Sequence, residues 1–183
     1  MAEEEPAPKK IKTGFEEHTL NISTAIMKDD EGKHFTDLVG GSVSTMQGIG
    51  PKATEVATAL NLDTVEDLAN YKYFKWARAL ATLAETEVAG DRPEGSMMNV
   101  NKMVDKAYET KTLKEIVEAP AAALQGLSDA AGELLDDLGV KTIGELATFK
   151  YCRWAEAIVV AAQYEEVGTE AERKVAREQK ALQ

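Results

Sequence analysis

Few side chains in this sequence can perform chemistry, and their spacing argues against catalysis. The two histidines, His18 and His34, have no metal-ligand spacing with each other or with the single cysteine, Cys152. The sequence has no Walker loop, no Gly-x-Ser-x-Gly and no His-Glu-x-x-His. Acidic pairs such as Asp136-Asp137 and Glu165-Glu166 are adjacent on predicted helices, so their side chains diverge and are expected to be solvated. We therefore expect a protein that is not an enzyme and that needs no metal or cofactor.

A basic and aromatic stretch is the first feature that can bind a ligand. From Tyr71 to Arg78, cations alternate with rings, as on some surfaces that bind single-stranded nucleic acid. The basic residues of this possible face, in both places where it occurs, are Lys72, Lys75, Arg78, Lys150 and Arg153. On a helix whose rings face inward, the same cations step around the outer surface, where their stems cover apolar side chains. We favour this second interpretation.

The sequence is written twice, and this repetition gives the candidate residues their context. Shifted by 78 positions, residues 46–87 align with residues 124–165 without a gap. Trp76 then aligns with Trp154, and Lys72-Tyr73 aligns with Lys150-Tyr151. The alignment also places Cys152 on Phe74, which indicates an apolar packing position and not a reactive thiol. One fold unit used twice is the simplest explanation.

Capping signals predict that each unit consists of short helices. Capping boxes begin at Thr64, Thr112 and Thr142, and Ser128 is a predicted N-cap. Asn61 and Gly139 stand where left-handed C-caps belong. A further capping box, from Thr13 to Glu16, predicts a helix that runs to about Met27.

The longest predicted helices, near residues 72–84 and 150–166, carry an amphipathic stripe that faces a core. Its expected core residues are Tyr73, Trp76, Leu80, Tyr151, Trp154 and Ile158. No segment alternates like a strand, so we predict an all-α fold of two tandem multi-helix units. We divide the chain into a disordered tail (1–12), a first helical repeat (13–89), a linker (90–99), a second helical repeat (100–167) and a charged C-terminal helix (168–183).

The segment from Met46 to Ala53 resembles a helix-hairpin-helix motif. In that motif two short helices pack around a turn of the form apolar–x–Gly–apolar–Gly–x–x–Ala, and the stretch from Leu60 to Ala69 extends the resemblance. The motif implies that hairpin amides, the positive end of the second helix and a nearby lysine hold one nucleic-acid phosphate. In this sequence the implied phosphate-binding residues are Gly48, Ile49, Gly50 and Lys52.

The second copy departs from this pattern, and the overall charge is unfavourable for nucleic acid. Ser128, Asp129 and Ala130 replace the second glycine, the proline and the lysine of the first hairpin, and Asp129 would repel phosphate. The net charge of the chain is −11, so duplex binding would need a locally concentrated basic face. Nucleic acid therefore stays a possible but disfavoured partner.

These observations lead to an expected function as an interaction module. We expect a non-enzymatic protein–protein interaction or scaffold subunit of a larger assembly, with other proteins as partners. Two alternatives stay open: a nucleic-acid-binding module that uses the Gly48-Ile49-Gly50 hairpin, and a small-molecule or pigment-binding protein with its ligand near Trp76 and Trp154. No apolar run approaches the roughly 20 residues of a membrane helix, and no signal peptide is visible. We therefore expect an intracellular, soluble protein without membrane insertion.

Overall fold

The computed structural model describes residues 12–182, so the tail expected at 1–12 lies outside the described residues except for Lys12. The all-α class is confirmed: residues 12–182 contain helices and four isolated β-bridges but no strand. The α-helices are α1 (Phe35–Val39), α2 (Pro51–Ala59), α3 (Val65–Asn70), α4 (Lys72–Ala84), α5 (Leu113–Val117), α6 (Asp129–Asp137), α7 (Ile143–Ala147), α8 (Lys150–Ala162) and α9 (Glu170–Ala181). None of these helices is both long enough and apolar enough to cross a bilayer.

Short 3-10 helices complete the architecture and show its internal spacing. They are η1 (Lys28–Asp30), η2 (Val43–Thr45), η3 (Lys106–Tyr108) and η4 (Ala121–Ala123). Every element from η1 to α4 begins 78 residues before an element of the same type in the series from η3 to α8. We call residues 22–87 the first segment and residues 100–165 the second segment.

Local capping explains where most helices begin and end. The hydroxyls of Thr64, Thr112 and Thr142 each accept a hydrogen bond from the amide three residues later, and the carboxylate at that position accepts from the threonine amide. At the C-terminal ends, Asn61 and Gly139 have φ values of 58° and 81°, in the left-handed region that ends a helix. These caps are the ones that the sequence predicts.

The helix expected from Thr13 to about Met27 is wrong. The Thr13 amide does bind the Glu16 carboxylate, at 2.6 Å, but the contact closes only a turn. Gly14 has a φ of 85°, which no right-handed helix contains, so the helix is interrupted at its first residue after the cap. The segment instead runs without α-helix as far as α1.

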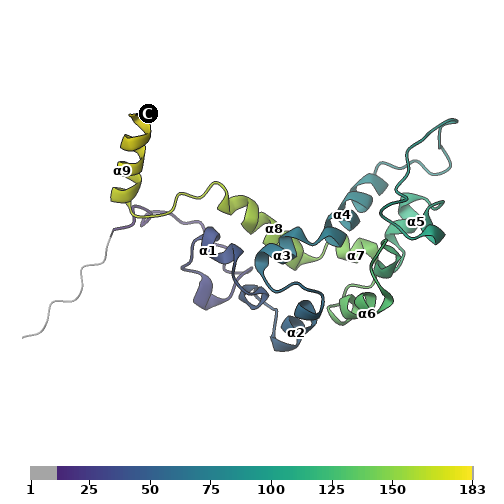
Figure 1. The fold of residues 1–183 in the computed structure, drawn as a ribbon, viewed down its shortest axis with the longest axis horizontal. Coiled ribbons are helices and arrows are strands. Elements are labelled where there is room, and N and C mark those ends of the chain that lie inside the picture. Colours follow the sequence, from purple (N-terminus) through teal and green to yellow (C-terminus); the bar gives the residue numbers. More distant parts are fainter. Residues whose placement is uncertain (1–11, 183) are drawn as a thin grey trace, which may run out of the picture.

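The two segments exchange their long helices. The helix α4 of the first segment packs against α5 and α7 of the second, and α8 of the second segment packs against α1 and α3 of the first (Figure 1). A further contact joins α2 to α6. Buried side chains of both segments consequently form one continuous core.

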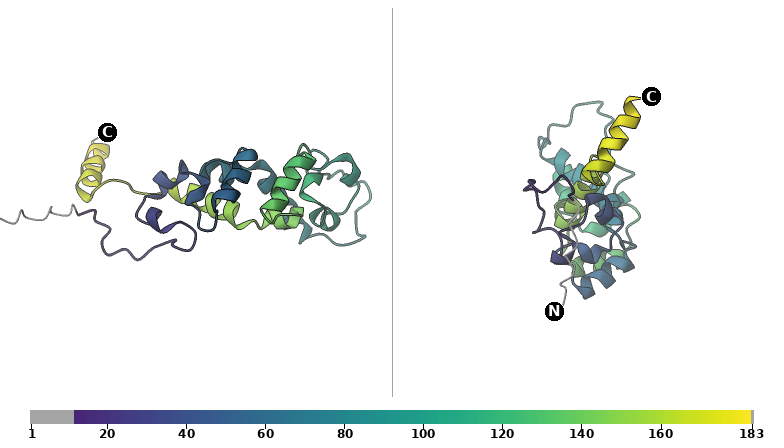
Figure 2. Two further views of the ribbon diagram at one scale, coloured as in Figure 1. Left: turned by 90° about the horizontal axis from the view of Figure 1, so that it is seen from below. Right: turned by 90° about the vertical axis from the view of Figure 1, so that its left-hand side faces the viewer.

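The resulting body is elongated, and its two ends differ. In both orientations α9 lies at one end of the long axis, and the loop of residues 90–99 lies at the other (Figures 1 and 2). The exchanged helices α4 and α8 occupy the middle (Figure 1). Each end therefore presents a different part of the chain to solvent.

Candidate functional site

The hairpin glycines lie beneath tyrosines of the opposite segment. Gly48 and Gly126 have φ values of 100° and 84°, so both turns use the backbone freedom of glycine. A Cβ atom on Gly48 would lie 2.7 Å from the hydroxyl of Tyr151, and one on Gly126 would lie 3.4 Å from the hydroxyl of Tyr73. Each long helix thus places its tyrosine on the turn of the other segment, and the turns serve packing between segments.

The remaining residues of the first hairpin share their surroundings with a carboxylate. The Ile49 amide donates to the Met46 carbonyl at 3.1 Å. Gly50 and Lys52 line an open hollow of about 320 Å³ together with Asp137, at the C-terminal end of α6. A phosphate at this place would meet the lysine and the start of α2, but also the negative charge of Asp137.

The rings of the long helices are half-buried, and lysines cover them. Lys72 Nζ lies 4.6 Å from the centroid of the Tyr73 ring and 5.3 Å from that of Trp76. In the second segment, Lys150 Nζ lies 4.9 Å from the Tyr151 ring and 5.4 Å from the Trp154 ring. The tyrosine and tryptophan of each helix meet edge to face. These cation–π contacts occupy the ring faces that a nucleic-acid base would need.

The other residues of the possible basic face make separate contacts. Lys75 Nζ donates to the Asn70 side chain at 2.9 Å, and Arg153 is exposed. The Arg78 guanidinium forms a two-pronged ion pair with Glu156, with one hydrogen bond of 2.8 Å. This pair raises the pKa of Arg78 and lowers the pKa of Glu156.

Among the expected core residues, the aliphatic ones lie deepest. Leu80 and Ile158 are 0% and 3% exposed. The four rings, of Tyr73, Trp76, Tyr151 and Trp154, are half-buried. Neither hollow found among the described residues is lined by Trp76 or Trp154, so no cavity favours a pigment or small molecule between them.

Two glutamates at the ends of the long helices cap helices of the opposite segment. The Glu87 carboxylate accepts hydrogen bonds from the amides of Leu113 and Lys114, at 2.9 and 3.0 Å. The Glu165 carboxylate accepts from the amides of Phe35 and Thr36, at 3.0 and 2.9 Å. Both carboxylates therefore satisfy amides at helix N-termini that have no partner within their own helices.

The expected solvation of the Glu165-Glu166 pair is therefore wrong. The Glu165 side chain is only 16% exposed and also contacts His34 Nδ1 at 3.2 Å. Burial opposes its ionisation, but the hydrogen bonds from Thr36 and Phe35 outweigh this effect and lower its pKa. Glu166 instead binds Arg177 at 2.7 Å. Adjacent carboxylates diverge as predicted, but each one finds a partner.

Cys152 is buried, as its alignment with Phe74 predicts, and burial raises the pKa of its thiol to about 12. Tyr71 lies in the same region, is 9% exposed, and is the one buried side chain of residues 12–182 whose polar atom lacks a partner. Burial is also the main cause that raises the pKa of Tyr71, followed by proximity to Cys152. In the alignment, the equivalents of Tyr71 and Cys152 are Phe149 and Phe74. The extra hydroxyl of tyrosine therefore compensates for the smaller volume of cysteine.

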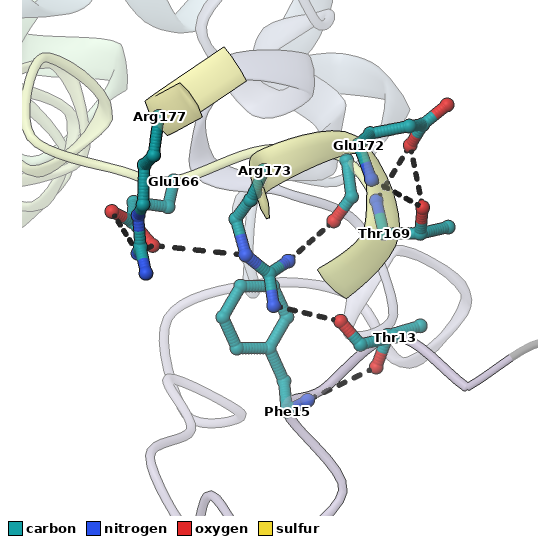
Figure 3. A network of polar contacts seen from close by, with 8 residues as sticks. Thr13, Phe15, Glu166, Thr169, Glu172, Arg173 and Arg177 are labelled. Carbon is teal, nitrogen blue, oxygen red and sulfur yellow. Dashed lines mark hydrogen bonds and ion pairs between the residues drawn. The ribbon is translucent and has the colours of Figure 1, made fainter. Parts of the chain in front are cut away.

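A single arginine anchors the C-terminal helix to the N-terminal part of the chain. The Arg173 side chain is 12% exposed, lies over the Phe15 ring at 4.0 Å, and donates to the Thr13 carbonyl at 2.9 Å. It also donates to the Gly168 carbonyl and lies 3.7 Å from Glu166 (Figure 3). No residue of α9 belongs to the buried core. The helix is thus fixed in position while most of its surface stays in solvent.

Apolar side chains are exposed at both ends of the molecule. Leu83, Val88, Met97 and Met98 lie at the end of α4 and on the chain that follows it. Val160, Tyr164, Val167, Val175 and Leu182 lie at the end of α8 and on and around α9. Exposed apolar groups that gather in this way are typical of interaction surfaces.

The described residues offer no group of His, Cys, Asp and Glu side chains that could hold a metal ion. Comparison of the chain with protein-family models, curated proteins and solved structures yields no match. A functional interpretation therefore depends on the geometry of this chain alone.

Proposed function

We propose that this protein is a non-enzymatic scaffold or interaction subunit of a larger assembly, and that α9 is its docking helix. The observation that carries the proposal is the combination of a firm anchor and an exposed surface in α9. Arg173 holds the helix against Thr13 and Phe15, while Val175 is 52% exposed and Leu182 is 88% exposed. A helix that serves only its own fold would normally bury such side chains.

The body that carries this helix is well suited to a rigid support. We propose that the first and second segments are tandem copies of one helix-hairpin-helix-like unit. The 78-residue spacing of their elements supports this interpretation, as do the equivalent positions of Gly48 and Gly126 beneath tyrosines. Exchange of α4 and α8 joins both units through one core, which limits motion of one unit relative to the other.

The proposal is tested by the size of the protein in native extract of its source cells. We expect the full chain to migrate with a mass well above 19.9 kDa, and a chain that ends at Gly168 to lose this shift. Arg173→Ala is the matched point variant, because it releases the anchor and keeps the exposed face. A monodisperse monomer in native extract would exclude the scaffold role.

Nucleic-acid binding is a second candidate that one observation favours. Gly50, the N-cap of α2, has no side chain that could satisfy the first amides of the helix, and Lys52 is exposed beside it. Fluorescent duplex and single-stranded DNA at about 50 mM salt would detect such a site, because phosphate contacts are strongest there. Binding that Lys52→Glu abolishes would support this function, and undetectable binding at low salt would exclude it.

A further inference from the structure

The two ends of the long axis carry complementary surfaces. At one end, residues 83–99 contain four carboxylates and one arginine, a net charge of −3, together with the exposed apolar residues of the α4 end. At the other end, α9 contains four basic and three acidic residues, a net charge of +1. Figures 1 and 2 place α9 and the loop of residues 90–99 at opposite extremes of the body.

The loop at the acidic end holds two methionines outward. The Arg92 guanidinium donates to the carbonyls of Ser96 and Met98, both at 2.9 Å, and so closes the loop upon itself. Met97 and Met98 are nevertheless 88% and 78% exposed. Flexible thioether side chains on an ordered loop form an adaptable apolar surface, of the kind that accepts the face of an amphipathic helix.

The exposed face of α9 points away from its own anchor. Successive residues of a helix are about 100° apart, so Val175 lies about 200° around the axis from Arg173. Leu182 lies seven residues after Val175 and returns to the same side within about 20°. The guanidinium therefore engages the body on one side of the helix, and the apolar stripe is free on the other.

From these relationships we propose that the partner of α9 is a second copy of this chain, bound head to tail. The stripe of Val175 and Leu182 on one molecule packs on Met97 and Met98 of the next, and Leu83 and Val88 extend the acceptor surface. The basic side chains of α9 then face the carboxylates of residues 83–99. Because donor and acceptor lie at opposite ends, the contact does not close on itself and produces a linear chain of molecules.

This inference deepens the proposed function, because it names one partner of the same docking helix. It is tested with the purified full chain by sedimentation velocity and light scattering, over a wide concentration range and at low salt. We expect the weight-average mass to rise from 19.9 kDa through successive multiples as concentration increases. Added salt should reduce this rise, because it screens the charge attraction between the ends. A mass that stays at 19.9 kDa throughout would overturn the inference.

Paired variants identify the two surfaces. Val175→Asp removes the donor and Met97→Ser with Met98→Ser removes the acceptor, and all three residues are exposed, so the fold should persist. Each variant alone should remain monomeric. An equimolar mixture should form a dimer that does not grow, because each variant retains one intact end.

The control variant is Tyr164→Ser, which removes an 83% exposed ring at the end of α8 and leaves both proposed surfaces intact. It should associate like the wild type. Loss of association in Tyr164→Ser, or continued self-association of the acceptor variant alone, would overturn the head-to-tail arrangement. A purified monomer that still migrates in a large assembly in native extract would refute self-association and leave the scaffold proposal standing.

Discussion

Arg78 and Glu156, which form an ion pair across α4 and α8, occupy equivalent positions of the two segments, 78 residues apart. Equivalent residues can contact each other only where an axis that relates the two segments passes between them. Two arginines or two glutamates at this place would repel each other. The pair therefore marks the centre of the molecule and requires that the two segments differ there.

Charge reversal at this centre should expose the requirement. Arg78→Glu places two carboxylates together, and we expect a loss of about 1 kcal/mol, because both side chains are partly exposed and solvent weakens the interaction. The double variant Arg78→Glu with Glu156→Arg should recover most of that loss. Urea unfolding of the four members of this cycle measures the coupling. Equal destabilisation by the single and double variants would show that the pair contributes nothing specific.

The capping carboxylate of Glu165 should make stability depend on pH. Its pKa is lowered on folding from an ordinary value of 4.5, so its contribution is present above pH 4.5 and is lost as the pH falls through the lower folded value. At pH 7 we expect Glu165→Gln to cost about 1 kcal/mol, and this difference should vanish in acid. Thermal unfolding from pH 7 to pH 3 measures both effects. Glu85→Gln, on an exposed glutamate, is the matched control, and a similar loss there would refute a specific cap.

The two glycines of the first hairpin should respond differently to alanine. Gly48→Ala introduces a Cβ atom at a φ of 100° and 2.7 Å from the Tyr151 hydroxyl, so we expect a loss of about 2 kcal/mol or more. Gly50→Ala adds a Cβ atom with no neighbour within 4 Å and should cost about 0.5 kcal/mol or less. Adding Tyr151→Phe to Gly48→Ala should restore part of the loss. Chemical denaturation of the three variants measures these differences, and equal effects at both glycines would contradict the packing role of Tyr151.

The thiol of Cys152 should be inert in the folded protein. It is buried and its pKa is raised to about 12, so the reactive thiolate is scarce at neutral pH. We expect alkylation by iodoacetamide only under denaturing conditions. Rapid stoichiometric labelling of the native protein, followed by mass spectrometry, would contradict this burial.

The neighbouring hydroxyl of Tyr71 provides a second test of the same region. Because it is buried without a partner, Tyr71→Phe should leave stability unchanged or raise it by up to about 1 kcal/mol. Tyr151→Phe serves as a comparison on a hydroxyl that packs on a glycine turn. Marked destabilisation by Tyr71→Phe in urea unfolding would show that the hydroxyl has a partner.

The capping boxes at Thr64 and Thr142 and the left-handed residues Asn61 and Gly139 could be predicted from sequence because their signals are local. Thr13 shows the limit of such signals: its box forms, but Gly14 prevents a helix. A pattern of caps says which residues start helices and does not say which surfaces those helices will meet.

The exchange of α4 and α8 could not be predicted in this way, since it depends on contacts between residues far apart in the chain. One signal was nevertheless present. Glu87 and Glu165 are identical in the alignment, and each caps the opposite segment. Identity at equivalent positions marks contacts made twice, whereas the difference between Arg78 and Glu156 marks a contact made once, at the centre.

The helix exchange also has a consequence for synthesis of the chain on the ribosome. Residues 72–84 emerge well before residues 113–147, which contain the two helices that α4 packs against. Until then, the apolar side of α4 has no permanent cover, so the nascent first segment must wait in an incomplete state. Its buried residues, among them Phe74 and Leu80, become protected only when translation is nearly finished.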